Sequence, residues 1–200
     1  MALITVRPTA ADVTIANSIA AHTNPPTEKI ARLLTWGADE HILVALAAAW
    51  WFGARGQSRR RRRAADHVLL TTLVASVIPH LMKAIFDQER PDRLTVRGHR
   101  RGVPLSGNRL DAFPSGHAVH VGALASAASQ LPRHERNAVW LIGAGLVATR
   151  IVLLAHWTSD VIAGLAIGAL TERWLRRLTG YGRDPDKRQR RGHATVSRLD

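Results

Sequence analysis

Five apolar segments separated by basic stretches constrain the fold of this chain more than any other feature. The segments cover residues 41–54, 65–86, 117–131, 137–156 and 161–175. A transmembrane helix needs roughly 17–25 residues; the second and fourth segments reach that length, and the first, third and fifth are short of it. Glycine and alanine recur in the last three, and such small residues let helices pack closely in lipid. The pattern favours an all-α fold, an integral membrane bundle of about five transmembrane helices, although length alone leaves a soluble helical core open.

The placement of positive charge predicts how this bundle is oriented. The predicted loop between the first and second segments holds five consecutive arginines at residues 59–63, and more arginines lie between the third and fourth segments and after the fifth. Under the positive-inside rule these three regions face the cytoplasm, which leaves the N-terminus outside. Tryptophans at the segment ends fit interfacial belts. They are Trp50, Trp51, Trp140 and Trp174 at the predicted inner ends, and Trp36 and Trp157 at the outer ends.

Three regions follow from the composition. Residues 1–37 read as two short helices lying at the membrane interface, the second capped by Thr27, and no secretory signal peptide is evident. Residues 38–178 are expected to form the transmembrane domain, and the basic tail 179–200 is expected to be disordered and cytoplasmic. The formal net charge of +13 could suggest a nucleic-acid partner. We favour the interpretation that the arginines set the orientation of the protein in the membrane, and no nucleic acid is expected. The chain has no cysteine, which excludes disulfides and thiolate metal sites.

The stretch Phe-Pro-Ser-Gly-His at 113–117 is the first candidate for chemistry. Ser115 suits the N-cap of a helix, where its hydroxyl can accept from an N–H of the first turn. Gly116 allows another group to approach the backbone closely. The start of a helix presents free N–H groups and a positive dipole end to an anion. His117 would stand on that first turn, where it can give or take a proton. Taken alone, the stretch is more often a simple turn.

Further polar residues collect at the predicted outer ends of the segments. Lys83 and Arg150 lie at membrane depth, where charge is costly and indicates function. With Arg90 and a helix N-terminus they would suit a tetrahedral dianion such as phosphate. His156 and Asp160 are four residues apart, so a carboxylate could hold the imidazole in one tautomer, whether the helix continues or turns there. The basic loop 87–113 would be either a solvated loop or an entrance for an anionic substrate.

These motifs resemble the three-part signature of the type 2 phosphatidic acid phosphatase (PAP2) superfamily, which also includes vanadium haloperoxidases. The resemblance covers about residues 65–175. It rests on Lys83, six residues and Arg90-Pro91; on Pro114-Ser115-Gly116-His117; and on Arg150, five residues, His156, three residues and Asp160. One position departs from the family pattern: Thr149 stands where the family usually has serine, and the hydroxyl is retained.

The resemblance implies a role for each of these residues. His156 would be the nucleophile that forms a phosphohistidine, Asp160 would orient it, and His117 would be the acid for the leaving group. Lys83, Arg90, Ser115, Gly116 and Arg150 would bind the phosphoryl oxygens. No metal and no cofactor would be required. His120, three residues after His117, is interpreted as a packing or supporting residue and not as a metal ligand.

The sequence therefore predicts a metal-independent phosphatase that hydrolyses a lipid phosphate or diphosphate at the outer face of the cell membrane. Phosphatidate, phosphatidylglycerol phosphate and a polyprenyl diphosphate are all plausible substrates, and transfer to an alcohol instead of water is open. Two alternatives remain: a vanadate-dependent haloperoxidase, and a non-catalytic lipid-binding membrane protein. The oligomeric state is not indicated.

Overall fold

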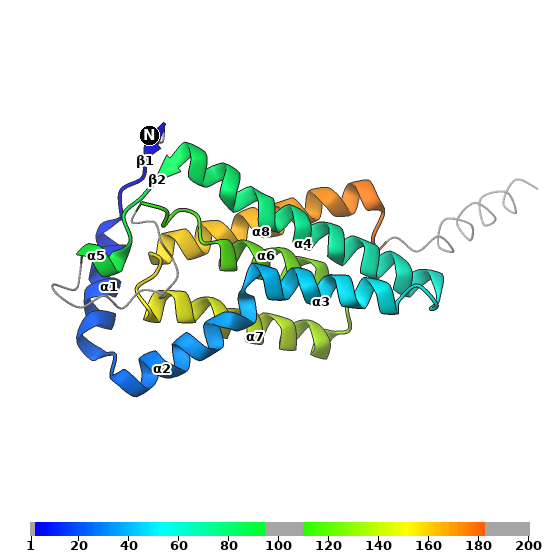
Figure 1. Cartoon of the computed structure of the whole chain (residues 1–200), viewed down its shortest axis with the longest axis horizontal. Helices are drawn as coiled ribbons and strands as arrows, with labels where there is room; N and C mark the ends of the chain where they lie inside the picture. The colour runs from blue at the N-terminus through cyan, green and yellow to red at the C-terminus, as the bar shows by residue number, and fades with distance from the viewer. Residues whose placement is uncertain (1–2, 95–109, 183–200) are drawn as a thin grey trace, which may run out of the picture.

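The computed structural model describes residues 3–94 and 110–182, which form an elongated and mostly helical bundle (Figure 1). The predicted apolar segments fall on five helices of this bundle, and the helical fold class is confirmed in that sense. These helices are α3 (Glu40–Gly53), α4 (Arg59–Ile85), α6 (Gly116–Ala127), α7 (Arg133–Val152) and α8 (Thr158–Thr179). The short 3-10 helix η2 (Ala128–Gln130) links α6 to α7.

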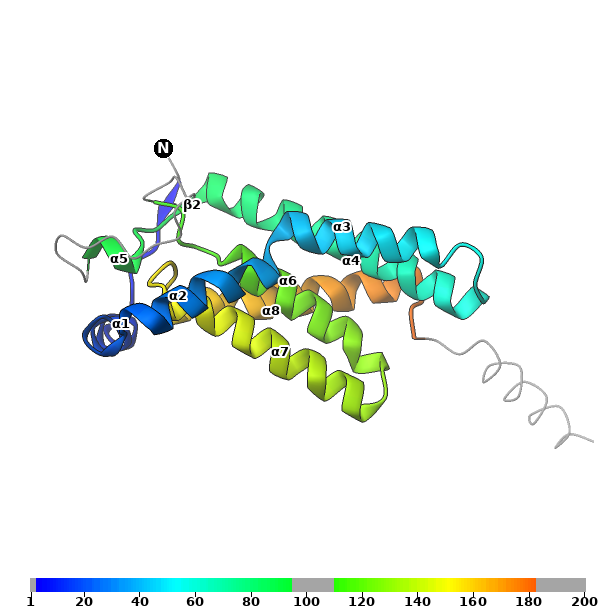
Figure 2. The ribbon, with the colours of Figure 1, turned by 60° about the horizontal axis from the view of Figure 1, so that its bottom comes forward.

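Helix α6 is the central element of the bundle, packed against α8, α4 and α7 (Figure 2). Glycines make its contact with α8 possible. A Cβ atom on Gly164 would lie 2.7 Å from the carbonyl oxygen of Ser115, and one on Gly168 would collide with the carbonyl oxygen of Val119. This close approach fixes the first turn of α6 against the first turns of α8.

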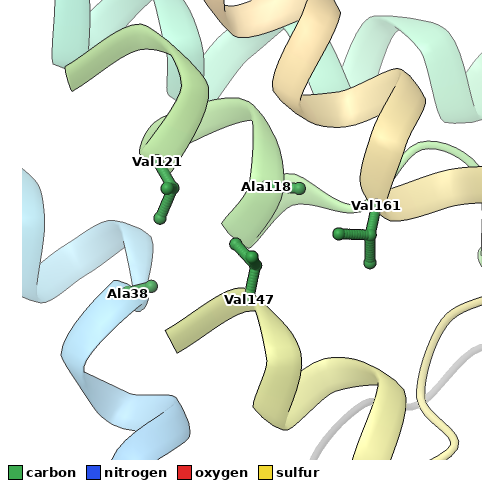
Figure 3. Packing of buried hydrophobic residues seen from close by; sticks show 5 residues of the cluster. All are labelled: Ala38, Ala118, Val121, Val147 and Val161. Carbon is green, nitrogen blue, oxygen red and sulfur yellow. The ribbon is translucent and has the colours of Figure 1, made fainter. Parts of the chain in front are cut away.

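A small apolar core ties the N-terminal part of the chain to the bundle. Figure 3 shows Ala38, from the 3-10 helix η1 (Thr35–Ala38), facing Val121 of α6 and Val147 of α7. Ala118 and Val161 complete the cluster. Because Ala38 is only 1% exposed, η1 is anchored in the core and does not simply lie on the surface.

The first two helices lie across one end of the bundle (Figure 1). In α1 (Ala10–His22), Ala16 packs with Leu154 and Trp157; in α2 (Pro25–Leu34), Ala31 packs with Leu153. These helices therefore cover the turn between α7 and α8. The N-cap of α2 is Asn24, whose side chain accepts from the N–H of Thr27, so the predicted Thr27 cap is wrong.

A short strand pair joins the same end. Residues Ile4–Thr5 (β1) pair in parallel with Phe86–Asp87 (β2), directly after α4 ends. The single turn α5 (Pro91–Leu94) follows. The strand pair is a local departure from the all-α prediction, and it holds the N-terminal segment beside the end of α4.

Among the described residues, α4 is the one helix that is both long and apolar enough to cross a membrane, and α3 is apolar but shorter. Five crossings are therefore not confirmed and stay a prediction. The reason is physical: α6 has 12 residues, which at 1.5 Å per residue gives about 18 Å, well short of a hydrocarbon core of about 30 Å. Charged residues shorten the apolar parts of α7 and α8.

Two sequence expectations are corrected by the structure. The arginine run 59–63 forms the first turns of α4 and is not a loop. Trp157 is buried, and its indole N–H donates to the carbonyl of Glu89 at 2.7 Å, so it belongs to the interior and not to an interfacial belt. Trp36, Trp50, Trp140 and Trp174 are exposed.

Candidate active site

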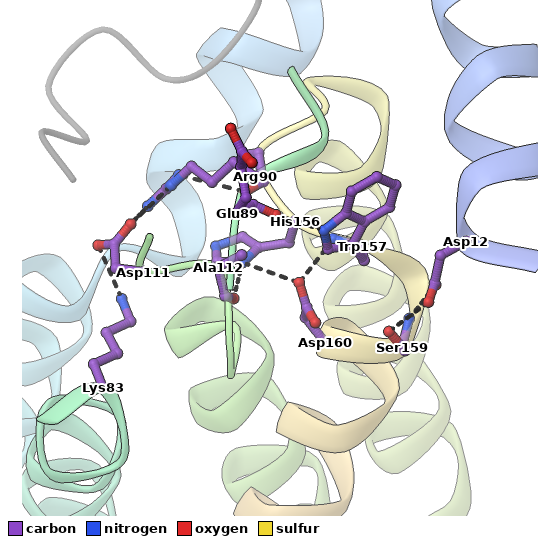
Figure 4. Close-up of polar contacts among 11 residues, drawn as sticks. Asp12, Lys83, Glu89, Arg90, Asp111, Ala112, His156, Trp157, Ser159 and Asp160 are labelled. Carbon is purple, nitrogen blue, oxygen red and sulfur yellow. Dashed lines mark hydrogen bonds and ion pairs between the residues drawn. The ribbon is translucent and has the colours of Figure 1, made fainter. Parts of the chain in front are cut away.

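The structure gathers the predicted site residues at the end of the bundle that α1 and α2 cover. Lys83 is in the last turn of α4, Arg90 follows β2, and Ser115, Gly116 and His117 open α6. Arg150 is in the last turn of α7, His156 lies in the turn between α7 and α8, and Asp160 is in the first turn of α8. Figure 4 shows the part of this cluster around Arg90, His156 and Asp160.

His156 is oriented by a backbone carbonyl. Helix α7 ends before it and α8 begins after it, so the chain turns here and His156 is not helical. Its Nδ1 lies 2.6 Å from the carbonyl oxygen of Ala112. Because a carbonyl can only accept, Nδ1 carries the proton and Nε2 keeps its lone pair. The nearest Asp160 oxygen is 4.0 Å from Nδ1, so Ala112 makes the hydrogen bond that the sequence had assigned to Asp160.

Asp160 instead holds the turn itself. It is fully buried, and Oδ2 accepts from the backbone N–H of Trp157 at 2.9 Å. The buried side-chain amide of Gln88, turned so that its nitrogen faces the carboxylate, donates to Oδ1 at 2.6 Å. Asp160 thus links the start of α8 to the segment between Lys83 and Arg90, and fixes the loop that presents His156.

A second buried carboxylate, on helix α1, fixes the turn between α7 and α8. Asp12 of α1 accepts from the backbone N–H of Ser159 at 2.9 Å and from its hydroxyl at 2.8 Å. Burial alone would raise the pKa of Asp12, but hydrogen bonds from Ser159 and Thr9 outweigh it and hold the pKa below its usual value of 3.8. Asp12 is therefore ionised at neutral pH and joins α1 to the loop that carries His156.

Asp111 joins two of the predicted phosphate-binding cations. The Nε and Nη2 atoms of Arg90 donate to Asp111 Oδ1 at 2.8 and 2.7 Å, and Lys83 Nζ lies 3.5 Å from Oδ2 (Figure 4). The Arg90 side chain is buried, so the pair shields an otherwise costly charge. Asp111 thereby sets where both cations point.

Two of the predicted phosphate-binding residues have a buried donor with no partner among the described residues: Ser115 through its hydroxyl and Arg150 through Nε. Ser115 is the N-cap of α6, as predicted, but its hydroxyl caps no N–H of the first turn. A buried donor left unpaired costs about 1–3 kcal/mol. Together with the N-terminus of α6, these donors suit the oxygens of a phosphoryl group.

His117 contacts a residue that the sequence did not single out. Its Nε2 lies 3.1 Å from the carbonyl oxygen of Thr35, in η1. The Thr35 hydroxyl accepts from Nη1 of Arg150 at 2.9 Å. Behind them, Nδ1 of His120 lies 3.0 Å from the carbonyl of Gly116, which supports the first turn of α6.

Four residues of this cluster were missed as site residues: Thr35, Gln88, Asp111 and Ala112. Gln88 and Asp111 lie in the basic loop 87–113, which was interpreted only as a solvated loop or an entrance for an anionic substrate. Thr35 lies 80 residues before Ser115 and has no sequence signal. No group of three or more histidine or acidic side chains that could hold a metal occurs in the described ranges.

Comparisons with known proteins converge on one family. The family model described as the PAP2 superfamily matches residues 64–184. The chain is 35% identical over 114 residues to a lipid A 1-phosphatase of Rhizobium johnstonii, and 38% identical over 113 residues to one of Rhizobium etli. Each alignment covers 56% of this chain but only 45% and 47% of these relatives, so the chain spans less than half of their length.

Two solved structures share the fold. Aquifex aeolicus LpxE superposes with a TM-score of 0.63 at 16% identity, covering 84% of this chain and 96% of that one. A transmembrane PAP2-type phosphatidylglycerolphosphate phosphatase from Bacillus subtilis superposes with a TM-score of 0.57 at 19% identity, covering 84% of both. At these identities the likeness establishes a shared architecture.

Proposed function

Because the chain belongs to the PAP2 superfamily, we propose that it is a phosphatase that removes a phosphate group from a membrane lipid. One observation carries the proposal. The unpaired donors of Ser115 and Arg150 and the lone pair on His156 Nε2 belong to one buried cluster, at the N-terminus of α6. A nucleophile beside a set of anion donors is what phosphoryl transfer requires.

The proposed reaction has two steps. His156 Nε2 attacks phosphorus, the bond from phosphorus to the leaving oxygen breaks in line, and a proton from His117 neutralises that oxygen. Lys83, Arg90, Arg150, the Ser115 hydroxyl and the Gly116 N–H bind the equatorial oxygens. Water then attacks the phosphohistidine, giving its proton to His117, and His156 leaves as neutral imidazole. Ala112 keeps the proton of His156 on Nδ1 throughout, and Asp160 holds the turn.

We propose a lipid A-type phosphate as substrate, because lipid A 1-phosphatases are the relatives found at 35% and 38% identity. The surface of the bundle supports a lipid environment. Large apolar side chains point outward on α7 and α8, including Leu141, Ile142 and Ile162, all more than 60% exposed. Such a surface is unfavourable in water and favourable in a bilayer. The protein would lie in the cell membrane, with the site on the outer side.

Phosphate release by the detergent-purified protein tests the proposal. The panel holds lipid A, phosphatidate, phosphatidylglycerol phosphate and a polyprenyl diphosphate, each assayed with and without a chelator. We expect release that survives chelation, and a loss of at least about 10³-fold in kcat for His156→Ala. His134→Ala is the matched control, because His134 is exposed at the opposite end of the bundle.

The outcomes separate the parts of the proposal. Normal turnover by His156→Ala, or loss of activity on chelation, would overturn the metal-free phosphohistidine mechanism. Turnover of another lipid in preference to lipid A would overturn the proposed substrate but would not contradict the proposed mechanism.

A further inference from the structure

Helix η1 lies outside residues 64–184, the part matched by the family model, yet it touches two proposed site residues. Thr35 is 3% exposed and faces the site with two oxygen atoms. Its carbonyl oxygen accepts a hydrogen bond from His117 Nε2 at 3.1 Å, and its hydroxyl oxygen accepts one from Arg150 Nη1 at 2.9 Å. One residue therefore contacts both the proposed acid and one of the proposed phosphate-binding cations.

The position of Thr35 is itself well fixed. Its backbone N–H donates to the carbonyl of Ala31, which continues the last turn of α2. Three residues later Ala38 is anchored in the apolar core between α6 and α7. Thr35 is thus held from both sides, by a helix that packs on the α7–α8 turn and by the core of the bundle.

These contacts have chemical consequences. A carbonyl accepts and never donates, so the bond to Thr35 keeps a proton on Nε2 of His117 and sets the plane of its ring. In the proposed mechanism His117 acts as an acid when both nitrogens are protonated, and the proton that it gives to the leaving oxygen and takes back from water is the one on Nδ1. The hydroxyl aims the planar guanidinium of Arg150, whose Nε is the unpaired donor at the site. In the proposed mechanism His117 protonates the leaving oxygen, so Thr35 would act on the leaving-group side of the phosphoryl group.

We propose that Thr35 is a positioning residue that couples the acid His117 to the phosphate-binding Arg150, so that the N-terminal region completes the active site. The inference rests on the proposed function. Thr35→Val removes the hydroxyl at nearly constant volume, and Thr35→Ser retains it. A hydrogen bond to a charged group is worth enough that we expect Thr35→Val to lower kcat/KM about tenfold or more. Thr35→Ser should stay within about threefold of the wild type.

Two controls separate positioning from folding. Thr72 is a buried threonine whose hydroxyl donates to the carbonyl of Val68 in its own helix, so Thr72→Val should leave kcat/KM within about twofold. A double-mutant cycle pairs Thr35→Val with Arg150→Lys. If Thr35 acts through Arg150, Thr35→Val should lower kcat/KM only slightly further in a protein that already carries Arg150→Lys. If the two residues act independently, the fold-losses in kcat/KM of the two single variants should multiply in the double variant. Full additivity, or a Thr35→Val enzyme with wild-type kinetics, would overturn the inference.

Inorganic phosphate provides an assay that does not need turnover. We expect phosphate to bind Thr35→Val at least about fivefold more weakly than it binds the wild type, measured by calorimetry in detergent, with Thr35→Ser close to the wild type. If the wild type binds phosphate but hydrolyses no lipid, the proposed function fails. The phosphate affinities of the wild type and of Thr35→Val still show whether Thr35 is coupled to Arg150. Equal phosphate affinity in Thr35→Val and the wild type would overturn that coupling.

Discussion

At the scale of single residues, Asp111 has an unusual position, because it places a negative charge inside a site proposed to bind an anion. It pairs with Lys83 and Arg90 at 3.5 and 2.7 Å. The carboxylate therefore has two opposing effects: it holds both cations in place, and it weakens their attraction for phosphate. Fast release of product phosphate would be one benefit of such an arrangement.

Asp111→Asn separates these effects. The substitution removes one negative charge about 4 Å or less from two cations, an interaction worth at least about 1 kcal/mol even in water. We expect inorganic phosphate to inhibit the variant at a concentration at least about fivefold lower, with a reduced kcat, in a product-inhibition assay. Asp66→Asn is the control, because Asp66 forms its ion pair with Arg55 on the exposed surface of α4. Unchanged inhibition by phosphate would contradict this role for Asp111.

The alternating direction of the predicted segments was sufficient to predict that Lys83, Ser115, Arg150 and His156 would lie at one end of the bundle. The orienting partners were beyond reach of the sequence. Ala112 acts through its carbonyl, which every residue possesses, and Thr35 comes close only through the path of α2 and η1. Roles that depend on backbone atoms or on distant loops leave no pattern in a single sequence.

At the scale of elements, the contact between α6 and α8 determines whether the site can form. Its glycines place the backbone of α8 directly against that of α6, where no side chain fits. Because Ser115 and His117 open α6 and Asp160 opens α8, any separation of the two helices would move the proposed phosphate-binding groups away from the loop that carries His156.

Gly168→Ala tests that contact. The added methyl group would collide with the carbonyl oxygen of Val119, and overpacking of this kind costs about 1–3 kcal/mol. We expect a lower thermal unfolding midpoint in detergent and lower phosphatase activity. Gly145→Ala is the matched control, since nothing lies within 4 Å of a Cβ atom added there. Equal midpoints for the two variants would show that the glycine contact is not limiting.

The apolar segments predicted each helix of the bundle to within a few residues at most ends, with α4 the exception. Its first turns are made of arginines, which read as a loop by hydropathy but are good helix formers. The first two helices were also foreseen, but not their packing over the turn between α7 and α8. That packing uses small residues such as Ala16 and Ala31, which carry little periodic signal.

At the scale of the whole molecule, the two ends of the bundle differ in chemistry. One end holds the candidate site, β1 and the N-terminal helices; the other holds the turn between α3 and α4 and the start of the arginine-rich α4 (Figure 1). Under the positive-inside rule, the end of a membrane protein that carries the arginines stays on the cytoplasmic side. The charge distribution therefore predicts that the site end faces outward, where a lipid phosphate of the outer leaflet would reach it.

Cysteine labelling checks this orientation. The chain contains no cysteine, so only the introduced cysteine can be labelled in this protein. Arg7 is exposed next to β1 at the site end, and Gly56 is exposed in the turn between α3 and α4. In spheroplasts of a bacterial expression host, a membrane-impermeant maleimide should label Arg7→Cys at once and Gly56→Cys only after lysis. Because both positions are exposed and outside the proposed site, folding and phosphatase activity should be retained, and activity confirms that the labelled protein is native. Labelling of Gly56→Cys in intact spheroplasts, with Arg7→Cys protected, would place the site on the cytoplasmic side and restrict its substrates to lipids of the inner leaflet.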